Sequence, residues 1–214
     1  MEKILFIGNS HTYYNDLPAT VARLYVLSGK EKPSVTMLTC GGKDLEWHLN
    51  QPQTAFNIRY GDYNKIIIQD RAHPFAGTQA FFERIEALKT LIEPTGAEIC
   101  LYMTWPHLAQ DYPTQNEISP AHHAAAQKFG MRLAPCGDAW AISRAENPEI
   151  EVYHTDWKHP SPYGSYLNAC LIYRALNNGE PLSFVENDFY NEHGLDPQKC
   201  RKLMTVANRM TVNL

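Results

Sequence analysis

The chain has 214 residues, of which 44% are hydrophobic and 20% are charged. These values are ordinary for a soluble globular protein, and we expect a single domain over 1–214 with one full hydrophobic core. The formal net charge is −4 and no long basic run occurs, so neither nucleic acid nor a membrane is an expected partner. The longest apolar run is also far too short to span a bilayer.

The cysteines are odd in number and far apart, at Cys40, Cys100, Cys136, Cys170 and Cys200. No C-x-x-C spacing occurs, so neither a zinc site nor a disulfide framework is indicated. Reduced thiols are typical of a reducing compartment, and the first residues carry no leader-like apolar stretch. We therefore expect a cytoplasmic protein, or a secreted or periplasmic one if a signal peptide has been removed.

Apolar runs and helical spacing alternate along the first third of the chain. The continuous run KILFIG at 3–8 predicts a strand that is covered on both faces. Apolar residues at helical spacing then predict a helix over 17–25 that stops near Gly29. The segment SVTMLTC at 34–40 predicts a second strand, KDLEWHLN a short helix, and NKIIIQD at 64–70 a third strand.

The alternation continues to the end of the chain. Helices are expected over 81–92, 118–129, 138–145, from Pro162 onward and over 197–209, with strands at 97–103 and 131–135. This order predicts a three-layer α/β/α fold whose flavodoxin-like sheet has five mostly parallel strands and helices on both faces.

Polar residues follow three of the predicted strands. They lie at Gly8–Ser10, at Gly41–Gly42 and at Gln69–Asp70. Because ligands bind at the carboxyl ends of the strands in such sheets, we expect these three places to meet along one edge.

A serine at such an edge can be a nucleophile if a base and a group that orients the base are within reach. Asp156 and His159 are three residues apart in a predicted loop, which allows the carboxylate to bond one imidazole nitrogen and Ser10 the other. The attacked carbonyl also needs hydrogen-bond donors for its oxyanion. The backbone N–H groups of Ser10 and Gly42 and the side-chain amide of Gln69 are the candidates.

Two segments resemble conserved blocks of the GDSL/SGNH hydrolase superfamily. GNSHT at 8–12 resembles its nucleophile block and DWKHPSPYG at 156–164 resembles its last block. The resemblance covers about 1–178, with 181–214 as a C-terminal extension. It implies that Ser10 is the nucleophile, His159 the base and Asp156 its partner, with Ser10 and Gly42 amides as oxyanion donors.

The third block departs from that family pattern. IIIQDRAHP stands where the family has Gly-x-Asn-Asp, so Gln69 takes the place of the third donor. A glutamine near this point resembles a carbohydrate-esterase-like branch of the superfamily. The alternative is that Gln69 only satisfies backbone groups at the end of the strand.

Further residues near the predicted edge are candidates for substrate binding: Asn9, His11, Asp70, His73, Trp105 and Trp157. Asp70, Arg71 and His73 line the pocket, unless Asp70 and Arg71 form a solvated pair. Trp105 or Trp157 is the candidate for stacking on a substrate ring. We expect no catalytic role for His11. The nine histidines show no metal-ligand spacing, so we expect neither a metal nor an organic cofactor.

The function we expect is a serine esterase that cleaves a small acyl ester through an acyl-enzyme. Acetyl on a carbohydrate is the substrate type we favour, and the oligomeric state is not determined. One alternative is a non-catalytic domain that binds a carbohydrate or acyl ligand. Another is a flavodoxin-like nucleotide-binding domain in which Gly8–Thr12 cradle a phosphate, although no phosphate-binding lysine or G-x-G-x-x-G pattern supports it.

Overall fold

The computed structural model describes residues 1–108, 114–184 and 194–212. These residues form a sheet of five strands, every neighbouring pair of which is parallel, in the order β2-β1-β3-β4-β5. The order is that of flavodoxin-like sheets, so the predicted fold class is confirmed. The strands are β1 (Lys3–Gly8), β2 (Ser34–Thr39), β3 (Lys65–Ile68), β4 (Glu98–Tyr102) and β5 (Arg132–Ala134).

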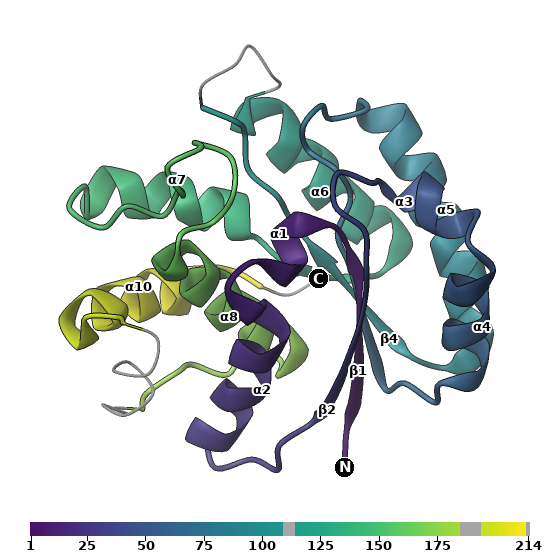
Figure 1. Ribbon diagram of the computed structural model, residues 1–214, viewed down its shortest axis with the longest axis horizontal. Helices are drawn as coiled ribbons and strands as arrows, with labels where there is room; N and C mark the ends of the chain where they lie inside the picture. Colours follow the sequence, from purple (N-terminus) through teal and green to yellow (C-terminus); the bar gives the residue numbers. More distant parts are fainter. Residues whose placement is uncertain (109–113, 185–193, 213–214) are drawn as a thin grey trace.

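Helices cover both faces of the sheet (Figure 1). One face carries α2 (Leu17–Leu27), α7 (Cys136–Glu146), α8 (Pro162–Leu176) and α10 (Pro197–Arg209). The other carries α3 (Leu45–Leu49), α4 (Pro52–Tyr60), α5 (Thr78–Ile92) and α6 (Gln115–Phe129). Three short turns complete the described elements: α1 (Ser10–Tyr13), η1 (Tyr14–Asp16) and η2 (Glu93–Thr95).

The side chains of β1 alternate between two hydrophobic cores. Ile4 and Phe6 face the core beneath α2 and α8, whereas Leu5 and Ile7 face the core beneath α5 and α6. A strand between two helix layers has no wet face, which is why its sequence is a continuous apolar run. Burial of each such side chain is worth about 1.5–3 kcal/mol.

The chain changes direction across the sheet at β1, which lies between β2 and β3. The connection from β1 to β2 passes over one face through α2, and the connection from β2 to β3 passes over the other through α3 and α4. At such a switch point the two connections leave a crevice beyond the carboxyl ends of the strands. Helix α1 begins at this place, directly after β1 (Figure 1).

The described part of the C-terminal extension packs onto the core beneath α2 and α8. Cys200, Leu203 and Val206 of α10 are buried in it. Arg174 at the end of α8 donates to the carbonyls of Ala207 and Met210. These charge-assisted hydrogen bonds also hold the end of α10 against α8. Residues 185–193 and 213–214 of the extension lie outside the described residues.

All five cysteines belong to the described ranges and are free thiols. Among the helices of 1–108, 114–184 and 194–212, none is both long and apolar enough to cross a bilayer.

Candidate active site

The nucleophile turn is the step from β1 into α1. Asn9 is the N-cap of α1, and its Oδ1 accepts the N–H of His11 at 3.1 Å. Gly8 precedes it at a point where a Cβ would lie 2.6 Å from Gln69 Oε1 and closer still to Thr12 Oγ1. Only glycine leaves room for these two side chains, which explains the glycine in the GNSHT motif.

Gln69 lies beneath this turn and is fully buried. Its Oε1 accepts hydrogen bonds from the Asn9 N–H and the Thr12 hydroxyl, each at 3.0 Å. Its amide nitrogen donates to the carbonyl of Asp70. The predicted role as third oxyanion donor is therefore wrong in this geometry, because the side chain folds back under the turn. The other interpretation of Gln69, that it satisfies groups at the strand end, agrees with these contacts.

Three further hydrogen bonds hold the same turn in place. The carbonyl of Gly8 accepts from His48 Nε2 at 2.7 Å and from the N–H of Cys40 at 3.2 Å. Burial lowers the pKa of His48, so this ring is neutral. Asn9 Nδ2 donates to the carbonyl of Lys43 at 2.9 Å. Asn9 is buried, and its side chain links the turn after β1 to the loop after β2. This structural role corrects its assignment to substrate binding.

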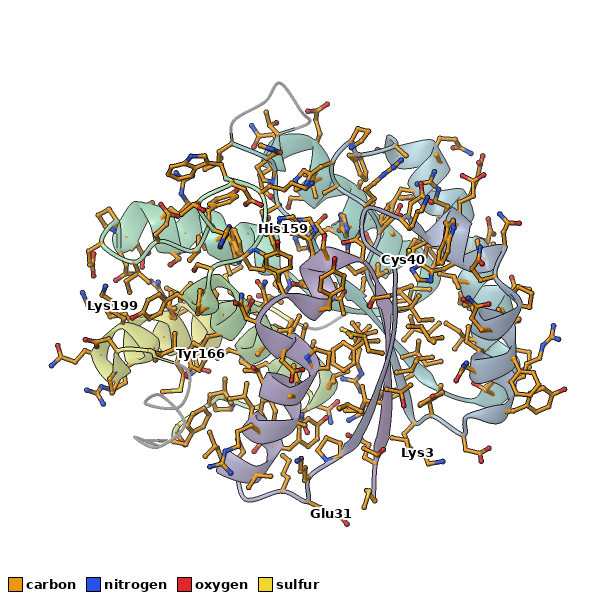
Figure 2. The ribbon with its side chains drawn as sticks, viewed as in Figure 1. Lys3, Glu31, Cys40, His159, Tyr166 and Lys199 are labelled. Atoms are coloured by element: carbon orange, nitrogen blue, oxygen red, sulfur yellow. The ribbon has the colours of Figure 1, made fainter. Side chains whose placement is uncertain are left out.

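Ser10, His159 and Asp156 form a continuous hydrogen-bonded chain. Ser10 Oγ lies 2.8 Å from His159 Nε2, and His159 Nδ1 lies 2.5 Å from Asp156 Oδ2. The structure thus brings together three residues from opposite ends of the chain. Figure 2 places the His159 side chain beside α1, at the carboxyl edge of the sheet.

Asp156 and His159 sit in a loop that closes on itself through a bridge between Tyr153 and Pro160. Asp156 Oδ1 accepts the N–H groups of Lys158 at 3.1 Å and of His159 at 2.9 Å. Partial burial tends to raise the pKa of Asp156, but the bonds from the His159 ring and from these N–H groups outweigh it and hold the pKa far below its usual range. The carboxylate therefore stays ionised beside the imidazole.

The two remaining predicted oxyanion donors are backbone groups. Ser10 is the first residue of α1, where N–H groups have no partner within the helix. Gly42 lies in the loop after β2 with φ +73°, and a Cβ there would meet nothing within 4 Å. Gly42 is thus required for its left-handed backbone and not for close packing. Donation by either group to an oxyanion stays a prediction.

His11 is 4% exposed and packs its ring against Trp105, with the centroids 4.9 Å apart. Burial, followed by the charges of neighbouring His73 and His159, holds the pKa of His11 far below its usual range. The ring packs inside the protein beside Trp105, so this geometry favours a packing role for His11 over the predicted substrate binding.

Trp105 is fully buried, and its ring stacks on Trp140 at 3.8 Å. Its Nε1 donates to the carbonyl of Lys158 at 3.0 Å. The expectation that Trp105 stacks on a substrate is wrong, because both its faces and its donor are used inside the protein. Its function is to support the loop that carries Asp156 and His159.

Asp70 is also turned inward. It is 3% exposed, accepts the N–H of Leu45 at 2.9 Å and pairs with Arg84 at 3.2 Å. Arg71 pairs with Asp44 instead, at 3.2 Å. Asp70 therefore anchors the start of α3, and both predictions for it, pocket lining and a solvated pair with Arg71, are wrong.

His73 and Trp157 remain candidates for substrate contact. His73 is half-buried, and its Nε2 donates to the Trp105 carbonyl at 2.8 Å. Burial lowers its pKa to about 4, so it is neutral near pH 7. Trp157 directly follows Asp156 and is 44% exposed, and its carbonyl accepts the N–H of Leu108 at 3.0 Å.

One residue of the site escaped the sequence analysis. The Tyr14 ring stacks face to face on His159, with centroids 4.1 Å apart and planes 4° apart. The only signal in the sequence is the spacing of four residues from Ser10 to Tyr14, which is one helical turn. That spacing alone does not reveal a partner 145 residues further along, since it contains no tertiary information.

No three His, Cys, Asp or Glu side chains of the described ranges cluster so that they could hold a metal ion.

Neither a protein-family model nor a curated protein matches this sequence. Solved structures do. A chain from Slackia heliotrinireducens that is named as an SGNH hydrolase is 26% identical, with a TM-score of 0.70 over 82% of this chain and 98% of its own. A DUF4886 family protein from Bacteroides uniformis is 17% identical, with a TM-score of 0.69 over 97% and 93%. A lipase/acylhydrolase from Enterococcus faecalis is 18% identical, with a TM-score of 0.66 over 83% and 96%.

All three likenesses show the α/β/α fold. The 26% identical chain from Slackia heliotrinireducens supports membership of the GDSL/SGNH hydrolase superfamily, as the two sequence blocks predict. The match to the Bacteroides uniformis protein extends over 97% of this chain, so it reaches into the C-terminal extension at 181–214.

Proposed function

We propose that this protein is a serine esterase that cleaves a small acyl ester. The single observation that carries the proposal is the hydrogen-bonded chain from Ser10 Oγ through His159 to Asp156, with distances of 2.8 and 2.5 Å. A hydroxyl, an imidazole and an ionised carboxylate in this order are the elements of a catalytic triad. The superfamily assignment supports the same class of reaction.

In the proposed reaction, Ser10 Oγ attacks the acyl carbonyl while His159 Nε2 accepts its proton. The carbonyl oxygen gains negative charge, which the N–H groups of Ser10 and Gly42 would stabilise. His159 then donates the proton to the leaving alcohol, and an acyl-serine remains. Water attacks this ester with His159 again as the base, which frees the acid and restores Ser10.

Asp156 determines which imidazole nitrogen carries the proton. Because its carboxylate accepts from Nδ1, the other nitrogen, Nε2, presents its lone pair to the Ser10 hydroxyl. The same negative charge then stabilises the imidazolium that forms during attack. The pKa of Asp156 is held low, so the carboxylate remains charged throughout the physiological range.

For the substrate we propose a short acyl group, such as acetyl, on a carbohydrate or similar polar alcohol. Trp157 supports this choice, because an exposed indole beside Asp156 offers a flat apolar face for a ring. Trp157 also has a left-handed backbone, with φ +57°. A bulky residue in that conformation is strained, and such strain tends to persist where a side chain has a function.

The test is Ser10→Ala, assayed on a short-chain aryl ester and on acetylated sugars. We expect kcat/KM to fall by ~10⁴-fold or more, because the acyl-enzyme cannot form. Ser34→Ala is the matched control, since Ser34 begins β2 at the amino edge of the sheet, away from the triad. Its rate should equal that of the unmodified protein.

A fluorophosphonate probe provides a readout that does not depend on guessing the substrate. Peptide mass spectrometry should find the label on Ser10 and on no other serine. Full hydrolysis by Ser10→Ala, or labelling that survives this substitution, would refute Ser10 as the nucleophile. An unmodified protein that neither hydrolyses these esters nor takes the label would refute the esterase proposal and leave a binding function on the same scaffold.

A further inference from the structure

The side chain that faces the proposed base has no role in the reaction described above. We propose that Tyr14 is a positioning residue for His159, whose ring keeps the imidazole in the plane of attack and favours the imidazolium. This inference rests on the proposed function of Ser10 and His159.

The stacking supplies a restraint that the triad bonds lack. Ser10 and Asp156 bond the imidazole in its own plane, at Nε2 and Nδ1. Two bonds along one line leave the ring free to rock about that line. A ring lying 4.1 Å away and 4° from parallel blocks this motion on one face, because tilting would drive ring atoms into Tyr14.

The backbone holds Tyr14 against the same segment that carries His159. The N–H of Tyr14 donates to the Ser10 carbonyl and closes the single turn of α1. Asn15 Nδ2 then donates to the carbonyl of Pro160 at 3.0 Å. Ser165 Oγ donates to the Tyr14 carbonyl at 3.3 Å. The stacking ring is thus tied on one side to the nucleophile and on the other to the residue after the base.

A left-handed turn makes these ties possible. Asn15 has φ +52° and the next residue, Asp16, has φ +48°. Asn and Asp adopt this conformation more readily than other residues with a Cβ, but two of them in succession are still unfavourable relative to glycine. The hydrogen bonds of Asn15 to Pro160 and to Ser165 Oγ at 2.9 Å compensate for part of that cost. The turn therefore has a geometry that the fold maintains against local preference.

The charges around His159 make the Tyr14 ring significant. Asp156 is the anion at Nδ1, and it favours the protonated ring. His11 lies 5.4 Å away, but burial lowers its pKa and it is neutral near pH 7. The π-face of Tyr14 is electron-rich and attracts a cation. Burial raises the pKa of the Tyr14 hydroxyl, so this ring stays an uncharged phenol.

The remaining groups close to the base do not favour the imidazolium. Burial lowers the pKa of His73 to about 4 and also lowers that of His107, so both are neutral near pH 7.

Lys158 follows Trp157 in the loop. Its positive charge further lowers the pKa values of His11, His73 and His107. Among these groups, the Tyr14 face and the Asp156 carboxylate are therefore the two that stabilise the charge which arises on His159 during attack.

Tyr14→Leu tests the inference, because leucine keeps an apolar side chain but removes the aromatic face. We expect kcat on an aryl ester to fall by about 3- to 30-fold with little change in KM. Tyr14→Phe keeps the face and should stay within about twofold of the unmodified protein. Tyr60→Leu is the matched control, since Tyr60 on α4 is 67% exposed and should leave kcat unchanged.

A second readout does not depend on hydrolysis. We expect the NMR signals of the His159 ring protons to shift downfield in Tyr14→Leu, because the ring current of the stacked aromatic ring is lost, and to stay in place in Tyr14→Phe. If Ser10→Ala hydrolyses esters normally, the proposed function fails, and the NMR comparison still tests the stacking. Unchanged His159 ring signals and equal kcat in Tyr14→Leu, or a Tyr14→Phe variant as impaired as Tyr14→Leu, would overturn the inference.

Discussion

Gln69 supports the nucleophile turn from below through one oxygen atom. Its Oε1 accepts from the Asn9 N–H and from the Thr12 hydroxyl, on either side of Ser10. A buried acceptor of this kind matters most when it is lost, because each donor then stays desolvated without a partner. At the scale of single residues, the position of the nucleophile thus depends on a side chain that substrate never reaches.

Gln69→Ala should lower the free energy of unfolding by about 2–4 kcal/mol, because it leaves two buried donors without an acceptor and creates a cavity. Urea unfolding followed by circular dichroism measures this change. Gln79→Ala is the control, since Gln79 is exposed on α5 and its side chain donates to Glu83 in the same helix. Unchanged stability together with a lower kcat would instead make Gln69 an oxyanion donor, as its place in the sequence block suggests.

At the scale of elements, the loop from Tyr153 to Pro160 keeps its shape without regular secondary structure. Its bridge closes the ends, and the N–H of Trp157 donates to the His154 carbonyl at 2.9 Å. Asp156 then caps the N–H groups that follow it. Because the loop makes its own hydrogen bonds, the carboxylate and the imidazole are aligned before substrate arrives.

Substitutions at Trp157 separate the loop conformation from the proposed contact with a substrate ring. Trp157→Ala and Trp157→Gly both remove the indole, so both should raise KM for an acetylated sugar while kcat stays nearly constant. Trp157→Gly should be more stable than Trp157→Ala by about 1–2 kcal/mol, because glycine adopts φ +57° without strain.

Thermal unfolding and initial rates on the two Trp157 variants check both expectations. A KM that is unchanged in both variants would exclude a substrate contact for the indole. Equal stability of the two variants would show that the backbone relaxes when the indole is removed.

At the scale of the whole molecule, neutral histidines inside the protein make its stability depend on pH. His122 on α6 is 2% exposed, and its Nδ1 donates to the Ile118 carbonyl at 2.8 Å. Burial lowers its pKa from the ordinary 6.5 to about 4. Between these values the unfolded chain binds the proton and the folded chain does not, so stability is complete above pH 6.5 and is lost as the pH falls toward 4.

We expect the contribution of His122 to fall by about 2 kcal/mol between about pH 7.5 and about pH 5, measured by urea unfolding at both values. His122→Leu should lose that part of the pH dependence. His123→Leu is the control, because the neighbouring His123 ring is exposed and faces Asp138. A pH dependence that survives in His122→Leu would assign the effect to other groups.

Periodicity located every strand of the sheet, because a strand between two helix layers must be apolar throughout. It did not find α4, whose buried residues are only Thr54 and Ile58. Two short segments were enough to predict Ser10, Asp156 and His159 as partners, because 8–12 and 156–164 resemble blocks of the GDSL/SGNH superfamily that carry a nucleophile and its base.

The direction of side chains at the site could not be predicted in the same way. Gln69 and Trp105 both follow strands, and sequence position alone does not say whether such a residue faces solvent or the core. The structure shows both fully buried. Tyr14 was missed because stacking on His159 depends on a contact between distant segments, which no local pattern encodes.

The bond between Ser10 and His159 joins residues 149 positions apart, and the ring that covers the imidazole comes from the same short turn as the hydroxyl. A nascent or cleaved chain that lacks the segment around Ser10 or the segment around His159 therefore has a base without a nucleophile, or a nucleophile without a base. Turnover would thus report that these two segments have come together, and it should reappear during refolding only with the step that unites them.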